Sequence, residues 1–201
     1  MKTYPLVSVG MPAYNRTETL VVAIECIINQ TYKNLEIIIS DNASASNEIE
    51  DIVKGYMKND KRILYTKQKR NLGAERNFQY IINKASGKYF LMAADDDIRS
   101  LDFIEKNIVF LENNADYVAS TSPSRFEHRN FDEHAMGDGS IECFDKYDRV
   151  NAFLNRWHAN ARFYSLVRRE EMQRAYTVNN FLGGDWMVVL SLLMLGKYKR
   201  I

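Results

Sequence analysis

Short apolar runs alternate along the first part of the chain with segments whose apolar side chains recur every three or four positions. The short runs are typical of buried strands, and the periodic segments are typical of helices with one apolar face. We expect strands at residues 6–11, 35–40, 63–66, 89–94 and 117–121, with helices after Thr17, near Ile49, from Gly73 to Ala85 and near Phe103. This alternation predicts right-handed crossovers and an α/β fold with a mostly parallel sheet covered on both faces.

The pattern changes beyond residue 122. Residues 123–147 are charged and contain glycine, and this stretch is longer than most connections in a compact domain, which indicates a functional loop or hairpin, or else a disordered segment. Farther along, we expect a helix over 150–157, a strand over 162–167 and a helix over 186–195, and residues 197–201 resemble the start of a strand. Because no low-complexity linker divides the chain, we expect a single domain over residues 1–201.

Composition fits this picture, since 46% of the 201 residues are hydrophobic and 26% are charged, enough for one well-formed core. The 27 Lys and Arg residues against 26 Asp and Glu leave a formal charge of +1, which gives no sign of a nucleic-acid-binding protein. Cys26 and Cys143 lack a metal-ligand spacing, so we interpret them as buried, reduced thiols of a cytoplasmic protein. The longest apolar run, residues 186–195, is too short to span a bilayer, which is consistent with a soluble or peripheral protein.

Three consecutive aspartates, Asp95, Asp96 and Asp97, follow the apolar run 89–94. Adjacent carboxylates at the end of a buried strand repel one another, so they call for a cation or strong hydrogen-bond donors. Carboxylate oxygens suit Mg²⁺ or Mn²⁺, and these ions suit a diphosphate. The alternative is that the triplet supplies negative charge to the helix beginning near Leu101, although a single Asp or Ser would cap that helix equally well.

Further candidate residues follow the other predicted strands. Tyr14 and Asn15 come after the first strand and Asp41 after the second, and in open α/β sheets a ligand binds beyond the carboxyl ends of the strands. A nucleoside diphosphate needs such a set: a surface for the base, a carboxylate for the ribose and a cation for the phosphates. In the simpler interpretation, Tyr14 packs on its own helix and Asp41 forms an Asx turn with Asn42. Arg76 either starts a helix or points its guanidinium at phosphate.

Four segments carry a resemblance to a known family, in this order: VSVGMPAYN, LEIIISDNAS, RNLGAERN and GKYFLMAADDD. They resemble the nucleotide-binding half of family 2 glycosyltransferases, which have the GT-A fold. The resemblance covers residues 5–122 well and the remainder loosely, and it is specific because four separate segments agree. It implies a Rossmann-like sheet flanked by helices, with a nucleotide-sugar-binding half over 1–122 and a smaller acceptor-side half over 123–201.

The resemblance also implies roles for individual residues. Many members read Leu-Asp-x-Asp-Asp, where this chain has Ala94 in place of the first aspartate. Members that read Thr-Asp-Asp make Asp95 the ribose-side residue and Asp96 the principal ligand of Mg²⁺ or Mn²⁺. Asp95 and Asp97 stay open as further metal ligands, Asp97 through a water molecule. The implied nucleotide-sugar site draws on the other segments as well: Pro12, Ala13, Tyr14, Asn15, Asp41, Arg76 and Asp95.

Sugar transfer also needs a base, because an alcohol is a poor nucleophile until its proton is removed. The family places an Asp or Glu just before a helix far downstream, and Asp185, which follows two glycines, matches that position. The alternative is that Asp185 only caps the helix. We interpret Asp185 as the catalytic base of an inverting transfer.

The resemblance implies a nucleotide-sugar donor, a UDP-sugar foremost, and a glycan or lipid-linked glycan as acceptor. It places the enzyme in surface polysaccharide or glycolipid assembly, in the cytoplasm or at the inner face of the membrane. One alternative is a non-catalytic nucleotide-sugar-binding domain or an inactive truncated fragment, because the chain stops soon after Asp185 and lacks the QxxRW segment of processive members. A sugar nucleotidyltransferase is a second alternative, but residues 11–15 lack the glycine-rich phosphate loop that it needs.

Overall fold

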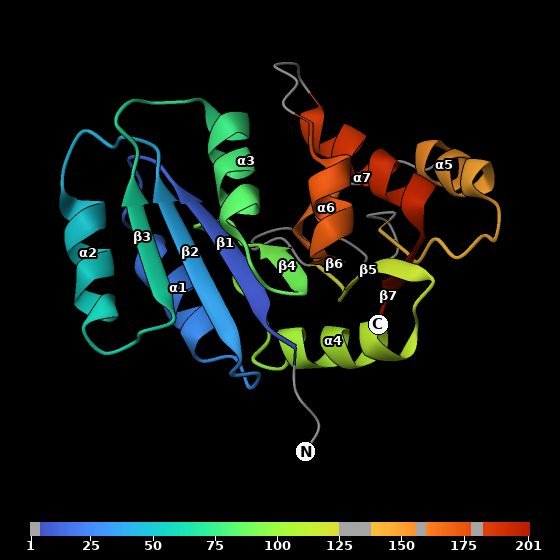
Figure 1. Cartoon of the computed structure of the whole chain (residues 1–201), viewed down its shortest axis with the longest axis horizontal. Helices are drawn as coiled ribbons and strands as arrows, with labels where there is room; N and C mark the ends of the chain where they lie inside the picture. The colour runs from blue at the N-terminus through green and yellow to red at the C-terminus, as the bar shows by residue number, and fades with distance from the viewer. Residues whose placement is uncertain (1–4, 125–137, 156–159, 178–182) are drawn as a thin grey trace.

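A computed structural model describes residues 5–124, 138–155, 160–177 and 183–201, which form a seven-stranded sheet with helices on both faces (Figure 1). The strand order is β3-β2-β1-β4-β6-β5-β7. Within the described residues β6 runs antiparallel to both neighbours, while the other pairs are parallel. The predicted mostly parallel α/β sheet is therefore confirmed. The strands are β1 (Val7–Ala13), β2 (Leu35–Asp41), β3 (Ile63–Lys67), β4 (Tyr89–Met92), β5 (Tyr117–Thr121), β6 (Leu166–Arg168) and β7 (Lys197–Arg200).

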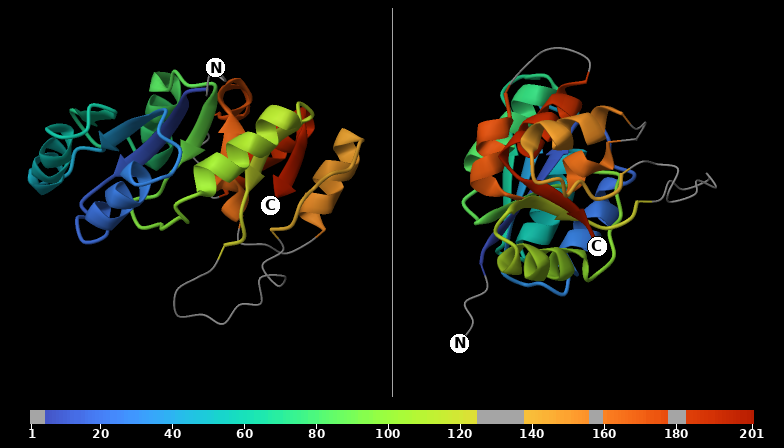
Figure 2. Two further views of the ribbon diagram at one scale, coloured as in Figure 1. Left: turned by 90° about the horizontal axis from the view of Figure 1, so that it is seen from below. Right: turned by 90° about the vertical axis from the view of Figure 1, so that its right-hand side faces the viewer.

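The helices cover the two faces of the sheet as separate layers (Figure 2). They are α1 (Leu20–Ile28), α2 (Glu48–Met57), α3 (Ala74–Lys84), α4 (Phe103–Asn113), α5 (Lys146–Leu154), α6 (Arg169–Ala175) and α7 (Gly184–Leu195). Apolar residues of α1, α2 and α4 join one hydrophobic cluster, and those of α3, α5, α6 and α7 join a second. Ile37 and Ile39 of β2 belong to the first cluster and Ile38 to the second. Strands buried on both faces explain the unbroken apolar runs in the sequence.

Helix α3 lies very close to the sheet, and this fixes its first turn beside the carboxyl end of β2. A Cβ atom at Gly10 would lie 2.2 Å from Cγ2 of Ile81, so β1 needs a glycine where α3 crosses it. Asn77 accepts a hydrogen bond from Ser40 Oγ at 2.6 Å and donates one to the Ser40 carbonyl at 3.0 Å. The start of α3, and Arg76 with it, is thereby attached to β2.

The second half of the chain departs from several predictions. Residues 162–164 were expected to be a strand, but they form a 3₁₀ helix, η1 (Ala161–Tyr164), because Phe163 N donates to the Asn160 carbonyl at 3.1 Å. Helix α6 was not predicted at all, and α5 begins inside the stretch expected to be irregular. Ile141, in that same stretch, pairs with Tyr198 of β7. The rest of the stretch, residues 125–137, lies outside the described residues.

Smaller corrections concern α1 and the cysteines. Helix α1 begins at Leu20 with Thr19 at its N-cap, not after Thr17. Cys143 is exposed and Cys26 is half-buried, so the expected burial of Cys143 is wrong, whereas both thiols are free as predicted. None of the described helices combines the length and the hydrophobicity that crossing a membrane requires.

Candidate functional site

The candidate residues of the first half meet at one edge of the sheet because their strands are parallel neighbours. Ala13 at the end of β1 pairs with Asp41 at the end of β2, and Gly10 of β1 pairs with Met92 at the end of β4. The segments that follow β1, β2 and β4 therefore leave the sheet side by side. This is the edge where open α/β sheets bind their ligands.

Asp41 is fully buried and holds the loops after β1 and β2 together. Its Oδ1 accepts hydrogen bonds from Ser44 N at 2.8 Å and Ser44 Oγ at 2.6 Å, and its Oδ2 accepts one from Tyr65 OH at 3.0 Å. Ser44 Oγ in turn accepts a hydrogen bond from Asn15 N at 2.9 Å. Burial and the negative charge of Asp41 raise the pKa of Tyr65. Asp41 therefore bonds to Ser44, three residues on, and not as the Asx turn that the simpler interpretation expected. The nucleoside-binding role of Asp41 stays a prediction.

The same loops contain backbone conformations that few residues tolerate. Asn15 has φ 52° and Ala43 has φ 64°, in the left-handed region that costs a residue with a Cβ atom roughly 1–2 kcal/mol. Asn15 offsets part of this cost because its Oδ1 accepts a hydrogen bond from Ala45 N at 2.9 Å, whereas Ala43 has no polar side chain to do so. The hydrogen bonds of Asp41 and Ser44 thus hold a locally strained loop in place.

The end of β1 offers an exposed ring next to this loop. Tyr14 is 47% exposed, whereas Ala13 is buried and contributes its carbonyl, which accepts a hydrogen bond from Asn42 N at 2.9 Å. Pro12 is half-buried and pairs with Ser40 of β2. An exposed aromatic ring beside a rigid loop can stack on a planar base, so this geometry suits the predicted role of residues 12–14.

The acidic triplet divides into two parts. Nη1 of Arg16 donates hydrogen bonds to both Asp95 and Asp96: to Oδ1 of Asp95 at 3.2 Å, and to Oδ2 of Asp96 at a shorter distance. Burial raises the pKa of Asp95, the charge of Arg16 opposes that rise and the charge of Asp96 adds to it. Two carboxylates thus converge on a single cationic group, which is the donor chemistry that a divalent cation needs.

Asp97 lies near a different cationic group, the guanidinium of Arg99. Its Oδ2 lies 3.7 Å from Nη2 of Arg99, whose side chain is only 8% exposed and donates to the Met92 carbonyl at 3.2 Å. Burial raises the pKa of Asp97, and the charge of Arg99 opposes this rise. Among the described residues no group of three or more acidic, histidine or cysteine side chains could enclose a metal ion. The triplet also does not start α4, whose N-cap is Asp102.

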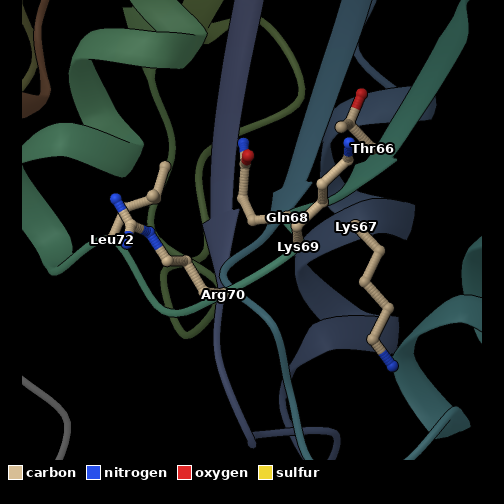
Figure 3. A pocket seen from close by; sticks show the side chains of 6 residues that line it. All are labelled: Thr66, Lys67, Gln68, Lys69, Arg70 and Leu72. Atoms are coloured by element: carbon tan, nitrogen blue, oxygen red, sulfur yellow. The ribbon is translucent and has the colours of Figure 1, made fainter.

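The segment between β3 and α3 forms a shallow hollow of about 480 Å³ beside the end of β3 (Figure 3). The side chains of Arg70 and Lys67 point in opposite directions (Figure 3). Arg76 is exposed in the first turn of α3 and forms no ion pair within the described part of the chain. Our sequence interpretation missed Lys69 and Arg70, although the basic run KQKR, which begins at the last residue of β3, was a signal. The lining residues are Thr66, Lys67, Gln68, Lys69, Arg70 and Leu72.

Asp185 lies in the first turn of α7 without capping it. The N-cap is Gly183, which has φ 95°, a conformation that favours glycine. The carboxylate of Asp185 is exposed, and its Oδ2 accepts a hydrogen bond from Asn160 Nδ2 at 2.7 Å. The capping interpretation therefore does not describe Asp185, whose role as a base stays a prediction.

Tyr164 connects the acidic triplet with Asp185. It ends η1, which contacts both β4 and α7 and leads into β6, the antiparallel neighbour of β4. Burial raises the pKa of Tyr164, and the charges of Asp97, Asp96 and Asp185 raise it further. Through η1, the end of β4 and the start of the chain's second half thus come together, although they are far apart in the sequence. No pattern in the sequence indicated this position, since Tyr164 was expected to lie in a strand.

A family model described as "Glycosyl transferase family 2" matches residues 8–175. Among curated proteins, an uncharacterized glycosyltransferase of Methanocaldococcus jannaschii is 41% identical over 113 residues, which are 56% of this chain and 39% of that protein. Glycosyltransferase GlyA of Streptococcus pneumoniae is 35% identical over 154 residues, which are 74% of this chain and 21% of that protein. The chain thus spans well under half the length of these curated relatives.

Solved structures share the fold at low sequence identity. Mannosyltransferase PcManGT from Pyrobaculum calidifontis, solved in complex with GDP-Man and Mn²⁺, superposes with a TM-score of 0.71 at 15% identity and covers 100% of this chain and 55% of that one. S. aureus TarS 1–349, solved in complex with UDP-GlcNAc, superposes with a TM-score of 0.72 at 12% identity and covers 97% of this chain and 58% of that one. The GT-A architecture expected from the four sequence segments is confirmed.

Proposed function

This chain belongs to glycosyl transferase family 2, and on that premise we propose that it transfers a sugar from a nucleotide-diphosphate sugar to an acceptor hydroxyl with inversion at the anomeric carbon. The observation that carries the proposal is geometric: β1, β2 and β4 end at one edge of the sheet, and η1 contacts both β4, which precedes the acidic triplet, and α7, which carries Asp185. A group that binds the diphosphate and a group that removes the acceptor proton must face the same sugar, and these contacts support such an arrangement.

The donor binds at the sheet edge in this proposal. Tyr14 stacks on the base, Asp41 and its hydrogen-bonded loop shape the nucleoside site, and Arg76 approaches the phosphates. In support, Tyr14 is exposed beside that loop, and Arg76 is exposed and unpaired within the described residues. The structural neighbours solved with UDP-GlcNAc and with GDP-Man support a nucleotide sugar as the donor class, and we propose a UDP-sugar.

A divalent cation, Mg²⁺ or Mn²⁺, fits the acidic triplet. Asp95 and Asp96 already converge on the guanidinium of Arg16, and Mg²⁺ needs only one or two protein carboxylates when phosphates and water supply its other ligands. We propose that Asp96 holds the ion with help from Asp95, and that Asp97 instead balances the charge of Arg99. When bound, the cation neutralises the charge that develops on the leaving diphosphate.

Asp185 completes the transfer step. The acceptor oxygen forms a bond to the anomeric carbon while the bond from that carbon to the diphosphate breaks on the opposite face, and the carboxylate of Asp185 takes the hydroxyl proton. The exposed position of Asp185 in the first turn of α7 supports this role because an acceptor can reach it. We propose a glycan or lipid-linked glycan of surface polysaccharide or glycolipid assembly as acceptor, and the cytoplasmic side of the membrane as location.

Two variants test the proposal by separating binding from transfer. Asp96→Ala should lose Mn²⁺-dependent binding of UDP-GlcNAc or GDP-mannose in calorimetry, whereas Asp185→Asn should keep this binding and lose release of the nucleotide diphosphate. Asp116→Asn is a matched control, because that carboxylate pairs with Lys197 at 2.7 Å on the far side of the sheet, and it should keep both activities. Full turnover by Asp185→Asn would show that the base assignment is wrong.

A further inference from the structure

Asn160 combines three properties that rarely occur together. It has φ 56° and ψ 34°, in the left-handed region, its residue is only 2% exposed, and its amide reaches a carboxylate at the candidate site. Asparagine enters the left-handed region more readily than most residues, so the backbone alone would explain its presence. The contact with Asp185 needs a separate explanation.

The segment that carries Asn160 is anchored by the buried side chain of Arg162. Arg162 Nη1 lies 3.0 Å from Asp138 Oδ1 in an ion pair whose side chains are 2% and 6% exposed. Asp138 Oδ2 also accepts a hydrogen bond from Ala161 N at 3.3 Å, and the Arg162 guanidinium packs against the ring of Tyr198 at 5.5 Å. A residue next to such an anchor has little freedom to move, which is what positioning another side chain requires.

Asn160 Nδ2 donates a hydrogen bond of 2.7 Å to Oδ2 of Asp185. Within the described part of the chain, no hydrogen bond reaches the other oxygen, Oδ1 of Asp185. An exposed aspartate otherwise rotates freely about its last torsion, which has broad minima. The amide therefore selects one orientation of the carboxylate and leaves one oxygen available to accept a proton.

We propose that Asn160 is a positioning residue for the base Asp185, an inference that rests on the proposed function. Asn160 fixes the carboxylate through Oδ2, so that Oδ1 faces the acceptor hydroxyl at the moment of attack. Because Asn160 is only 2% exposed, it offers almost no surface to a donor, so its loss should lower the rate of transfer and leave donor binding unchanged. Misplacing a reacting group by about 1 Å can cost up to about 100-fold in rate.

The Asn160→Gly variant separates this role from a structural one. Glycine accepts the left-handed backbone without strain, so the variant removes the amide while keeping the turn. Nucleotide release with Mn²⁺ is measured on UDP-GlcNAc, UDP-glucose and GDP-mannose, with water or an added glycan as acceptor. We expect kcat to fall by about 10- to 100-fold with an unchanged KM for the donor. Asn114→Gly, which removes an amide that donates to the Phe110 carbonyl at 2.8 Å far from the site, is the matched control and should keep the wild-type kcat.

A double variant decides whether Asn160 acts through Asp185. In an Asp185→Asn background, measured on its residual nucleotide release at high enzyme concentration, Asn160→Gly should cause no further loss, because residues that act as a unit are not additive. An Asn160→Gly enzyme with wild-type kcat, or with an equal additional loss in the Asp185→Asn background, would overturn the inference while leaving the proposed function intact. A wild-type chain that releases no nucleotide from any of these donors would instead overturn the proposed function, and this inference with it.

Discussion

Replacing Arg162 with methionine should destabilise the protein more than any exposed ion-pair substitution. The Arg162–Asp138 pair has side chains that are 2% and 6% exposed and a separation of 3.0 Å, and Arg162 Nη2 donates to the Gly139 carbonyl at 2.8 Å. Methionine keeps the aliphatic length and removes the charge, so the buried carboxylate of Asp138 loses its cation.

The expected magnitude follows from the burial of both partners. Breaking a buried pair by removing one partner costs about 3–5 kcal/mol, which is a large fraction of the stability of a typical domain, about 5–15 kcal/mol. For a chain of this size, 1 kcal/mol changes Tm by about 2–4 °C, so we expect Tm to fall by about 6–20 °C.

Urea unfolding followed by circular dichroism measures the free energy of unfolding directly. Lys106→Met is the matched control, since Lys106 pairs with Asp102 at 2.6 Å but the side chains are 63% and 40% exposed, and it should cost less than about 0.5 kcal/mol. The double variant Arg162→Met/Asp138→Leu should recover much of the loss, because apolar residues often replace a buried pair at little cost. A loss for Arg162→Met no larger than that of Lys106→Met would refute the reasoning.

Three further predictions concern single positions. Asp97→Asn should keep the Mn²⁺-dependent nucleotide binding that Asp96→Ala loses in calorimetry, because Asp97 faces Arg99; loss of binding in Asp97→Asn would make it a metal ligand. Ala43→Gly should raise Tm, because glycine removes the strain of about 1 kcal/mol that a Cβ atom causes at a φ of 64°. Ala152→Gly, inside α5, should lower Tm. Burial by itself would raise the pKa of Glu36, but hydrogen bonds from Ser8, Ser86 and Gly87 outweigh it and lower this pKa below 4.5. The stability that Glu36 contributes is therefore present above that pH and lost as the pH falls through the folded-state pKa, so Glu36→Gln should destabilise the protein at pH 7 in urea titrations. The difference from wild type should shrink below about pH 4.5, and a constant difference would contradict this cause.

Strands β1, β2 and β4 and their helices could be predicted because these strands are almost wholly buried, so their sequences are mostly apolar. The edge strand β3 is only partly buried and was identified by its place in the alternation. Helix α6 could not be predicted, since it is short and buries only Met172 and Ala175 among charged neighbours. Nor could η1, because Arg162 and Phe163 are both buried and read as part of a strand. Local pattern identifies elements with a regular buried face, and it fails where a tertiary contact sets the backbone.

In the candidate site, too, some features could be predicted from the sequence and others could not. The end of each parallel strand indicated where Tyr14, Asp41 and Asp96 would meet, because parallel neighbours end at the same edge. The partners of these residues could not be predicted. Asn160 and Asp185 are 25 positions apart and Arg16 and Asp96 are 80 apart, and the fold alone brings them together.

The most direct test of donor binding is a thermal-shift series with UDP-GlcNAc, UDP-glucose and GDP-mannose, each with and without Mn²⁺, on the wild-type chain and on Asp96→Ala. A ligand at 100 times its Kd stabilises a protein by about 2.7 kcal/mol, which corresponds to about 5–11 °C here. We predict such a shift for at least one nucleotide sugar in the wild type, only when Mn²⁺ is present, and none in Asp96→Ala. No Mn²⁺-dependent shift with any of the three in the wild type would contradict the proposed nucleotide-sugar site.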